Sequence, residues 1–124
     1  MTVISQTRHM KANGHYSPAI EYDGVIYVSG QFSVDPDTGE RKYGTVEDET
    51  LQALTNIELI LKEAGSDRSR ILKTTAYVCS MEDWDKVNDA YMQFFGAHKP
   101  VRIIVNAKEL HFGFKVEIEA VAAV

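Results

Sequence analysis

Cysteine and long apolar runs are the features this sequence most clearly lacks. Cys79 is the only cysteine among 124 residues, so no disulfide can form within the chain. No stretch reaches the roughly 20 consecutive apolar residues of a membrane-spanning helix. The first fifteen residues are polar, with no predicted element and no apolar core like that of a secretory signal. These absences predict a soluble, cytoplasmic protein with no membrane partner.

Positive charge is also in short supply. The chain has 13 Lys and Arg residues against 18 Asp and Glu residues, which gives a formal net charge of −5. Nucleic acid backbones are bound chiefly by clustered basic side chains, and here the basic residues are scattered. The balance therefore disfavours a nucleic acid partner. An acidic surface also repels anions at long range, so a carboxylate site would need its own local cation.

Neither metal-ligand spacing nor a strong compositional bias is present. The histidines, which never form a His-x-x-x-His pair, are His9, His15, His98 and His111. A zinc site is therefore not expected. The content of 44% hydrophobic and 25% charged residues is typical of globular proteins. The length suits a single domain spanning residues 1–124.

Hydrophobic periodicity divides the chain into strands and helices. Runs rich in β-branched and aromatic residues predict strands over residues 16–22, 25–29, 70–80, 101–106 and 114–121. Apolar residues recurring every three or four positions predict helices over residues 47–64 and 82–95. Thr45 and Ser80 are suitable N-terminal caps for these helices, and Gly65 suits a helix end. Asp23-Gly24 predicts a hairpin turn, and Gly30 interrupts the strand that follows it.

This order of elements predicts an α+β, or mixed α/β, domain. Helices alternating with strands form layers, here two helices packed on one face of a mixed sheet of about six strands. The other face of the sheet would then have no cover from its own chain. Such a face is expected to be covered by further copies of the protein. The sequence thus predicts an oligomer.

Arg102 stands within an otherwise apolar strand. It shares a strand face with Ile104, while Glu117 and Glu119 share a face of the last strand. If these two strands pair antiparallel, Arg102 lies opposite residues 117–119. Its planar guanidinium can bind a carboxylate through two parallel hydrogen bonds. Spacing alone leaves two interpretations open, a salt bridge across the sheet or a binding site for a carboxylate ligand.

Short motifs along the chain add to these residues. In order they are YSPA (16–19), YVSGQ (27–31), DPDTGE (35–40), EAG (63–65), KTT (73–75), VNDAY (87–91), KPVR (99–102) and VEIEA (116–120). Together they make the chain resemble the RidA/YjgF family of reactive-intermediate deaminases from about residue 16 to the end. The resemblance implies a chorismate-mutase-like fold of the bacillus type. It also implies a homotrimer with a cleft between each pair of subunits.

The resemblance also implies a reaction. Members of the family hydrolyse reactive 2-imino acids or their enamines, such as 2-iminobutanoate and 2-iminopropanoate, to 2-keto acids and ammonia. No cofactor or metal is implied. On this resemblance Arg102 binds the carboxylate of the small metabolite, and Glu117 positions the water.

The same resemblance assigns residues to the pocket wall. Tyr16, Ser29 and Gly30 are expected to line the pocket, and Trp84 is expected from the second helix of a neighbouring subunit. Two departures from the family pattern bear on the substrate. Bulky Ile104 stands where small residues usually follow the arginine, and His111 begins a His-Phe-Gly segment in place of a proline. Ile104 is predicted to narrow the pocket, and His111 to shape its rim.

Two other functions compete with the deaminase. A non-catalytic metabolite-binding or regulatory trimer would keep the cleft without the reaction, and the isoleucines after Arg102 favour it. An endoribonuclease is the third possibility, because that label is attached to the family. The acidic balance and the lack of a basic stripe argue against it here.

Overall fold

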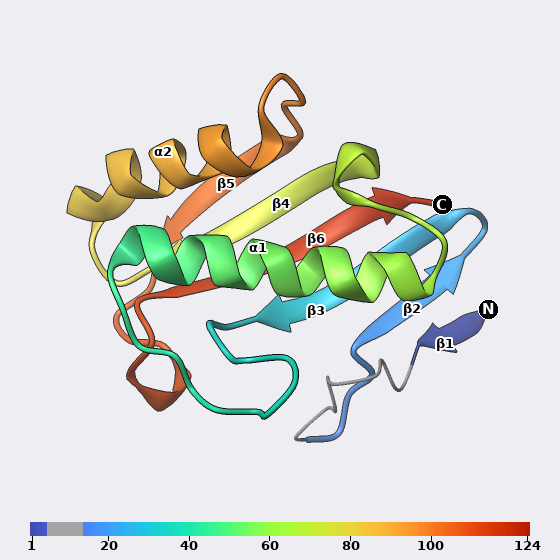
Figure 1. Ribbon diagram of the computed structural model, residues 1–124, viewed down its shortest axis with the longest axis horizontal. Coiled ribbons are helices and arrows are strands. Elements are labelled where there is room, and N and C mark those ends of the chain that lie inside the picture. The colour runs from blue at the N-terminus through green and yellow to red at the C-terminus, as the bar shows by residue number, and fades with distance from the viewer. Residues whose placement is uncertain (5–13) are drawn as a thin grey trace.

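The chain forms a six-stranded sheet with two helices on one face (Figure 1). The computed structural model describes residues 1–4 and 14–124. The strands are β1 (Thr2–Ile4), β2 (Ala19–Tyr22), β3 (Val25–Gln31), β4 (Ile71–Val78), β5 (Val101–Asn106) and β6 (Val116–Ala123). The helices are α1 (Val46–Glu63) and α2 (Trp84–Phe95), with 3-10 turns η1 (Arg68–Arg70), η2 (Met81–Asp83) and η3 (His111–Gly113). The predicted mixed sheet with two helices is confirmed.

Local signals set the limits of α1. The Thr45 side chain accepts a hydrogen bond from the Asp48 backbone, and the Asp48 side chain accepts one from the Thr45 backbone, forming a capping box. Gly65, just beyond the helix, has a φ of +79°, which glycine adopts without strain. The buried face of α1 packs on β3 and β6, and its fully buried apolar residues are Ala53, Leu54, Ile57, Ile60 and Leu61. Both predicted limits of this helix are confirmed.

The second helix starts slightly later than predicted. Ser80 accepts a hydrogen bond from the Glu82 backbone, but it caps the short turn η2, and α2 follows at Trp84. Gly96 ends the helix with a φ of +62°. The buried side of α2 carries Val87, Ala90, Tyr91, Phe94 and Phe95. Trp84 is 40% exposed, so it lies outside this apolar side.

The N-terminal strand is absent from the sequence prediction. Residues 2–4 pair antiparallel with β2, Val3 opposite Ile20. Three residues give too short a pattern to distinguish from a polar segment, which explains the miss. The predicted hairpin turn between β2 and β3 is confirmed, because Asp23 and Gly24 have φ values of 53° and 78°. His9 lies outside the described residues.

The predicted pairing of the last two strands is wrong. β5 pairs parallel with β4, setting Arg102 beside Thr74, and β6 lies on the other side of β4. A parallel neighbour requires a long crossover, and α2 provides it between β4 and β5. The apolar strand β6 takes a central position between β3 and β4 instead. β5 and β6 are therefore consecutive in the chain but are separated in the sheet by β4.

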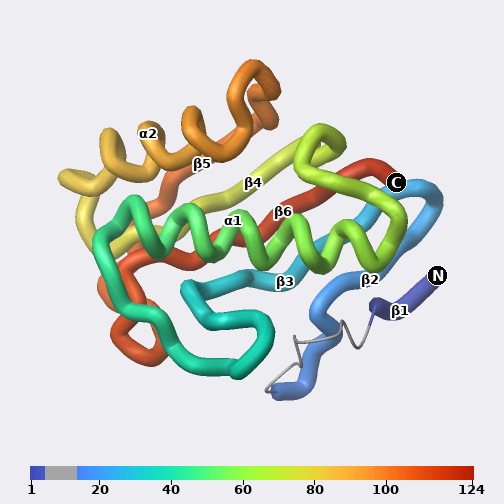
Figure 2. The backbone as a smooth tube through the Cα atoms, in the orientation of Figure 1, coloured from blue at the N-terminus to red at the C-terminus, as the bar shows by residue number. Residues whose placement is uncertain are grey.

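The sheet has one face under the helices and one open face (Figure 2). Side chains on the open face include several large exposed ones, with Tyr22 62%, Tyr27 51%, Val101 65% and Ile103 57% accessible. A sheet face with large exposed apolar side chains and no cover from its own chain is the feature from which the oligomer was predicted. The oligomer itself stays a prediction. Among the described residues, no helix has the length and apolar character needed to cross a membrane.

Candidate functional site

Glu117 lies against the backbone of Gly30, across the pair formed by β3 and β6. The register of this pair shifts between Val28 and Gln31, so the predicted interruption at Gly30 is a bulge within a longer strand. A Cβ atom on Gly30 would overlap the Glu117 carboxylate and come within 3.0 Å of its Cδ. Only glycine leaves room for this approach. The two residues therefore form one unit of the site.

The surroundings of Glu117 favour its neutral form. Burial raises the pKa of Glu117 above the ordinary value of 4.5, and the negative charge of Glu119 on the same face raises it further. Within the part of the chain that the structure describes, no cation forms an ion pair with Glu117. A carboxylate with a raised pKa is a stronger base once ionised. The side chain is thus suited to accept a proton from water.

Tyr16 and Ser29 lie beside this unit and line a groove. The Ser29 hydroxyl donates to the Ser17 carbonyl at 2.7 Å, and the Ser29 amide donates to the Pro18 carbonyl at 2.9 Å. These bonds hold the segment that carries Tyr16 against β3. The groove has a volume of about 550 Å³, and the side chains that line it include Tyr16, Tyr27, Ser29, Lys73, Thr75 and Glu119.

This groove lies on the open face of the sheet. Its lining includes Glu119, the next residue of β6 on that face, and does not include Glu117. Lys73 and Thr75 of β4 also face it. The sequence analysis did not single out Lys73 as a residue of this groove. Side chains alternate between the two faces of a strand, and Thr74 is buried beneath the helices. Lys73 therefore lies on the opposite face, which carries the glutamates, and this alternation was the available signal.

Arg102 lies on the other face, beneath α2. Its guanidinium carbon is 4.8 Å from the ring centre of Tyr91 and 5.3 Å from that of Trp84. Both rings belong to the same chain as this Arg102, and the expectation that Trp84 enters the cleft of a neighbouring subunit stays a prediction. Cation–π contacts of this kind hold a guanidinium in place without neutralising its charge. No described carboxylate lies within ion-pair distance of Arg102.

Tyr91 supports this arginine from the core. It is 6% exposed, and its hydroxyl is 2.8 Å from that of buried Thr74, the strand neighbour of Arg102. Burial raises the pKa of Tyr91 to about 12, although the Thr74 hydroxyl and the charge of Arg102 lower it. The phenol therefore stays neutral at physiological pH. Its helical spacing from Trp84 indicated a core role and did not reveal the contact with Arg102.

The two isoleucines after Arg102 lie on opposite faces. Ile104 is half-buried and packs against the core on the face of Arg102, two residues along the strand. Ile103 points to the open face and is 57% exposed. Only Ile104 is therefore placed to limit the space beside the guanidinium.

His111 begins the turn η3, ahead of the strand that carries Glu117. The residue is exposed, and its ring centre is 3.5 Å from that of Phe112. The turn follows the end of β5 and leads into β6. It therefore lies at the end of the sheet where β6 begins, close to Glu117 in the sequence. The described residues contain no group of three metal-binding side chains.

A single chain does not bring the two predicted catalytic residues together. Arg102 is on β5 beneath α2, and Glu117 is on β6 on the open face, with β4 between the two strands. The predicted contact between Arg102 and Glu117 within one chain is therefore wrong. Two strand spacings alone separate their backbones by about 10 Å. The structure instead separates the candidate residues into two groups, called half-sites below: one with Arg102, Trp84 and Ile104, and one with Glu117 and its neighbours.

Sequence comparison places these half-sites in context. A model of the endoribonuclease L-PSP family matches residues 6–124. The Mus musculus protein named 2-iminobutanoate/2-iminopropanoate deaminase is 42% identical over 120 residues, which cover 97% of this chain and 89% of the mouse protein.

Solved structures agree with the sequence comparison. YyfA of Yersinia pestis, described as a protein of unknown function of the conserved Rid family, is 38% identical with a TM-score of 0.93, covering 99% of this chain and 98% of its own. TdcF of E. coli, solved with bound serine, is 31% identical with a TM-score of 0.91, covering 100% of this chain and 99% of its own.

Proposed function

Because this chain belongs to the RidA/YjgF/L-PSP family, we propose that it hydrolyses reactive 2-imino acids, or their enamines, to 2-keto acids and ammonia. Arg102 binds the substrate carboxylate, and Glu117 positions and activates water. The mouse relative carries the name of this activity, which supports the proposal. The E. coli relative was solved with bound serine. Serine is a small molecule with a carboxylate, the group that Arg102 would bind in this protein.

The observation that carries the proposal is the state of Arg102. Its guanidinium is held by the rings of Trp84 and Tyr91, and among the described residues it has no carboxylate partner. A half-buried arginine without an internal partner favours an external anion. Its planar donors match a substrate carboxylate. This arrangement supports the ligand-binding interpretation over a salt bridge across the sheet.

The separation of the two half-sites supports a site that is shared between subunits. A substrate small enough to be one metabolite cannot reach Arg102 and Glu117 of the same chain from opposite faces of the sheet. A homotrimer in which the β5 edge of one subunit lies against the open face of the next would supply Arg102 from the first subunit and Glu117 from the second. Each of the three clefts would then be complete. The exposed apolar residues of the open face support this assembly.

The chemistry asks little of the protein. Glu117 accepts a proton from water as the oxygen adds to the electrophilic imine carbon, and the nitrogen takes up a proton. The resulting carbinolamine loses ammonia as its C–N bond breaks and its oxygen becomes the keto group. Orientation of substrate and water supplies most of the rate gain. None of these steps requires a cofactor.

The test is hydrolysis of freshly generated 2-iminobutanoate by wild-type protein and by Arg102→Ala and Arg102→Lys variants. Wild-type protein should accelerate ammonia release, and both variants should lose about 100-fold or more in kcat/KM, because lysine cannot bind a carboxylate with two parallel bonds. Thermal unfolding and a mass measurement of the oligomer serve as controls. Full activity in a folded Arg102→Ala variant would reject the proposal.

The second candidate function is a non-catalytic binding protein for small keto or amino acids. The observation in its favour is Ile104, whose half-buried side chain takes up space beside Arg102. Wild-type protein that binds 2-oxobutanoate through Arg102, yet leaves the rate of imine hydrolysis unchanged, would establish this alternative.

A further inference from the structure

The turn that precedes β6 is held in an uncommon backbone conformation. Phe112 has φ 61° and ψ 14°, a left-handed conformation that residues other than glycine rarely adopt. It costs roughly 1–2 kcal/mol relative to ordinary backbone. Such a conformation persists only where its surroundings hold it.

Two side chains from a segment distant in sequence, Arg41 and Tyr43, hold Phe112 in this conformation. The Tyr43 hydroxyl donates a 2.7 Å hydrogen bond to the Phe112 carbonyl, although 69 residues separate them in sequence. The guanidinium carbon of Arg41 lies 3.6 Å from the centre of the Phe112 ring. The Tyr43 ring also stacks on Phe114, with centres 4.9 Å apart. The turn is therefore fastened on both its backbone and its side chain.

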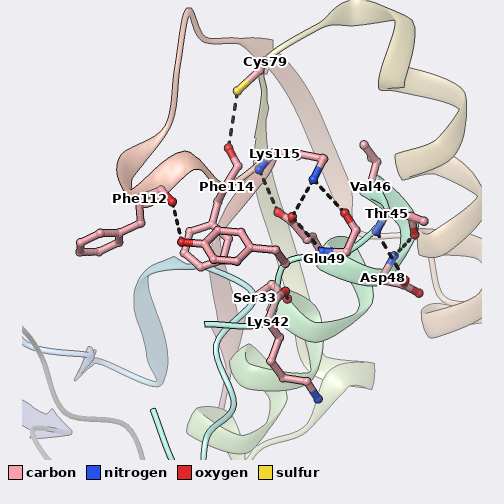
Figure 3. Close-up of polar contacts among 12 residues, drawn as sticks. Ser33, Lys42, Thr45, Val46, Asp48, Glu49, Cys79, Phe112, Phe114 and Lys115 are labelled. Atoms are coloured by element: carbon pink, nitrogen blue, oxygen red, sulfur yellow. Dashed lines mark hydrogen bonds and ion pairs between the residues drawn. The ribbon is translucent and has the colours of Figure 1, made fainter. Parts of the chain in front are cut away.

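A buried carboxylate fastens the other end of the same segment (Figure 3). Glu49 is fully buried and accepts a 2.8 Å hydrogen bond from the backbone of Lys115. The Lys115 ammonium donates to the Gly44 carbonyl at 2.9 Å and lies 3.5 Å from the Glu49 carboxylate. Residues 112–115 are thus attached at both ends to residues 41–49. Lys115 is two residues before Glu117.

The fastened turn lies at the end of the sheet that carries Gly30 and Glu117. Phe32, two residues after Gly30, stacks on Phe114 with ring centres 5.0 Å apart. The Phe32 and Phe112 rings meet edge to face at 6.5 Å. Because η3 has no strand partner, these contacts and the Tyr43 bond decide where it stands. Its two exposed rings, His111 and Phe112, therefore stand at the end of the sheet where β6 begins, which is the end that carries Glu117.

We propose that Tyr43 is a specificity-determining positioning residue for this site. By holding the Phe112 carbonyl, its hydroxyl fixes the His111–Gly113 turn as a rigid border that admits 2-imino acids with short side chains and excludes branched or aromatic ones. The inference rests on the proposed function, because it assigns the substrate class of the same site. It adds a residue that touches neither the substrate nor Glu117.

The test compares wild-type protein with Tyr43→Phe, which keeps the stacked ring and removes the hydroxyl. Titration calorimetry with pyruvate and with 4-methyl-2-oxopentanoate gives the ratio of the two dissociation constants. Wild-type protein should favour pyruvate. Tyr43→Phe should reduce that preference about fivefold, the equivalent of one lost hydrogen bond. Amide exchange at residues 112–114 should quicken in parallel.

Two further variants complete the design. Arg41→Gln removes the cation over the Phe112 ring and should change the ratio in the same direction. Ser69→Ala removes a hydroxyl hydrogen bond to Asp67 at the opposite end of β4 and should change neither readout. It controls for a general loss of stability.

The outcomes separate this proposal from the proposed function. An unchanged ratio in both Tyr43→Phe and Arg41→Gln overturns it, as does a changed ratio without faster exchange at residues 112–114. Wild-type protein that binds neither keto acid also overturns it. Protein that binds both acids yet never hydrolyses imines rejects the proposed reaction, and the binding ratio still decides the role of Tyr43.

Discussion

Gly30 and Glu117 approach so closely that residue 30 has no room for a side chain. A Cβ there would lie 3.0 Å from the Glu117 Cδ and 3.2 Å from its Cγ, with the carboxylate oxygen nearer still. The bulge in β3 creates this contact by bringing the Gly30 backbone under the carboxylate. The position of the proposed base is thus set by a neighbour that has no side chain.

Gly30→Ala should therefore displace Glu117 and lower kcat/KM for 2-iminobutanoate about 100-fold, the loss expected from a misplacement of about 1 Å. The matched control is Gly24→Ala in the β2–β3 turn, where φ is +78° and nothing lies within 4 Å of the added Cβ. That variant should lose stability through backbone strain and keep its activity. Equal activity losses in the two variants would contradict the positional role of Gly30.

The activity should depend on pH through Glu117. Because burial and Glu119 raise the pKa of Glu117, kcat/KM should rise with pH at a midpoint above 4.5. Glu119→Gln removes the smaller of these causes, so the midpoint should move down and stay above 4.5. Glu40→Gln, an exposed loop change, should leave it in place. A pH–rate profile over pH 4 to 9 measures the shift, and an unmoved midpoint in Glu119→Gln would count against the coupling.

The same raised pKa affects stability. The folded chain keeps the Glu117 proton at pH values where the unfolded chain has released it, so stability falls as pH rises from 4.5 through the folded-state pKa. Glu117→Gln should lack this fall, and denaturant unfolding at several pH values would detect it. Parallel pH curves for the two proteins would show that burial of Glu117 does not oppose its ionisation.

Trp84 should matter for binding more than for folding. It is 40% exposed and contacts Arg102, so Trp84→Ala should raise KM about fivefold through the lost cation–π contact, with little change in Tm. Trp84→Phe should recover most of the affinity. Met92→Ala, an exposed change on the same helix, is the control. A KM for Trp84→Ala equal to that of the wild type would remove Trp84 from the site.

Glu49 should contribute to stability through its buried bonds to Lys115. Glu49→Ala leaves the Lys115 amide without its acceptor, and we expect a loss of about 3 kcal/mol in the free energy of unfolding. Glu49→Gln keeps the shape and one acceptor, so about 1 to 2 kcal/mol is expected. Glu47→Ala, at a half-buried position in the same helical turn, should change stability by only about 0.5 kcal/mol. Urea unfolding measures all three.

Local features of this fold could be predicted from the sequence. Both helices follow from apolar spacing. The limits of α1 follow from Thr45 and Gly65 and the end of α2 follows from Gly96, because caps and stops act within a few residues. The β2–β3 hairpin follows in the same way from Asp23-Gly24. The start of α2 does not follow in this way, since Ser80 caps the turn η2 that precedes the helix. Short β1 could not be predicted, since three residues carry no usable period.

Strand order could not be predicted in the same way. The sequence shows which residues share a strand face, but the neighbour of each strand depends on packing of the whole sheet. The assumption that β5 and β6 pair because they are consecutive placed Arg102 next to Glu117. In the structure β4 lies between these two strands, and the side chains of Arg102 and Glu117 lie on opposite faces of the sheet. The sequence could therefore suggest residue types for the candidate site, but it could not predict their arrangement.

The central claim is that Arg102 and Glu117 act in one site while belonging to different subunits. Arg102→Ala and Glu117→Gln chains, each inactive alone, can be unfolded, mixed in equal amounts and refolded together. In a head-to-tail trimer a random mixture completes about one site in four, so activity near one quarter of wild type is predicted. A mixture as inactive as its separate components, while wild-type protein regains activity after the same treatment, would contradict the claim.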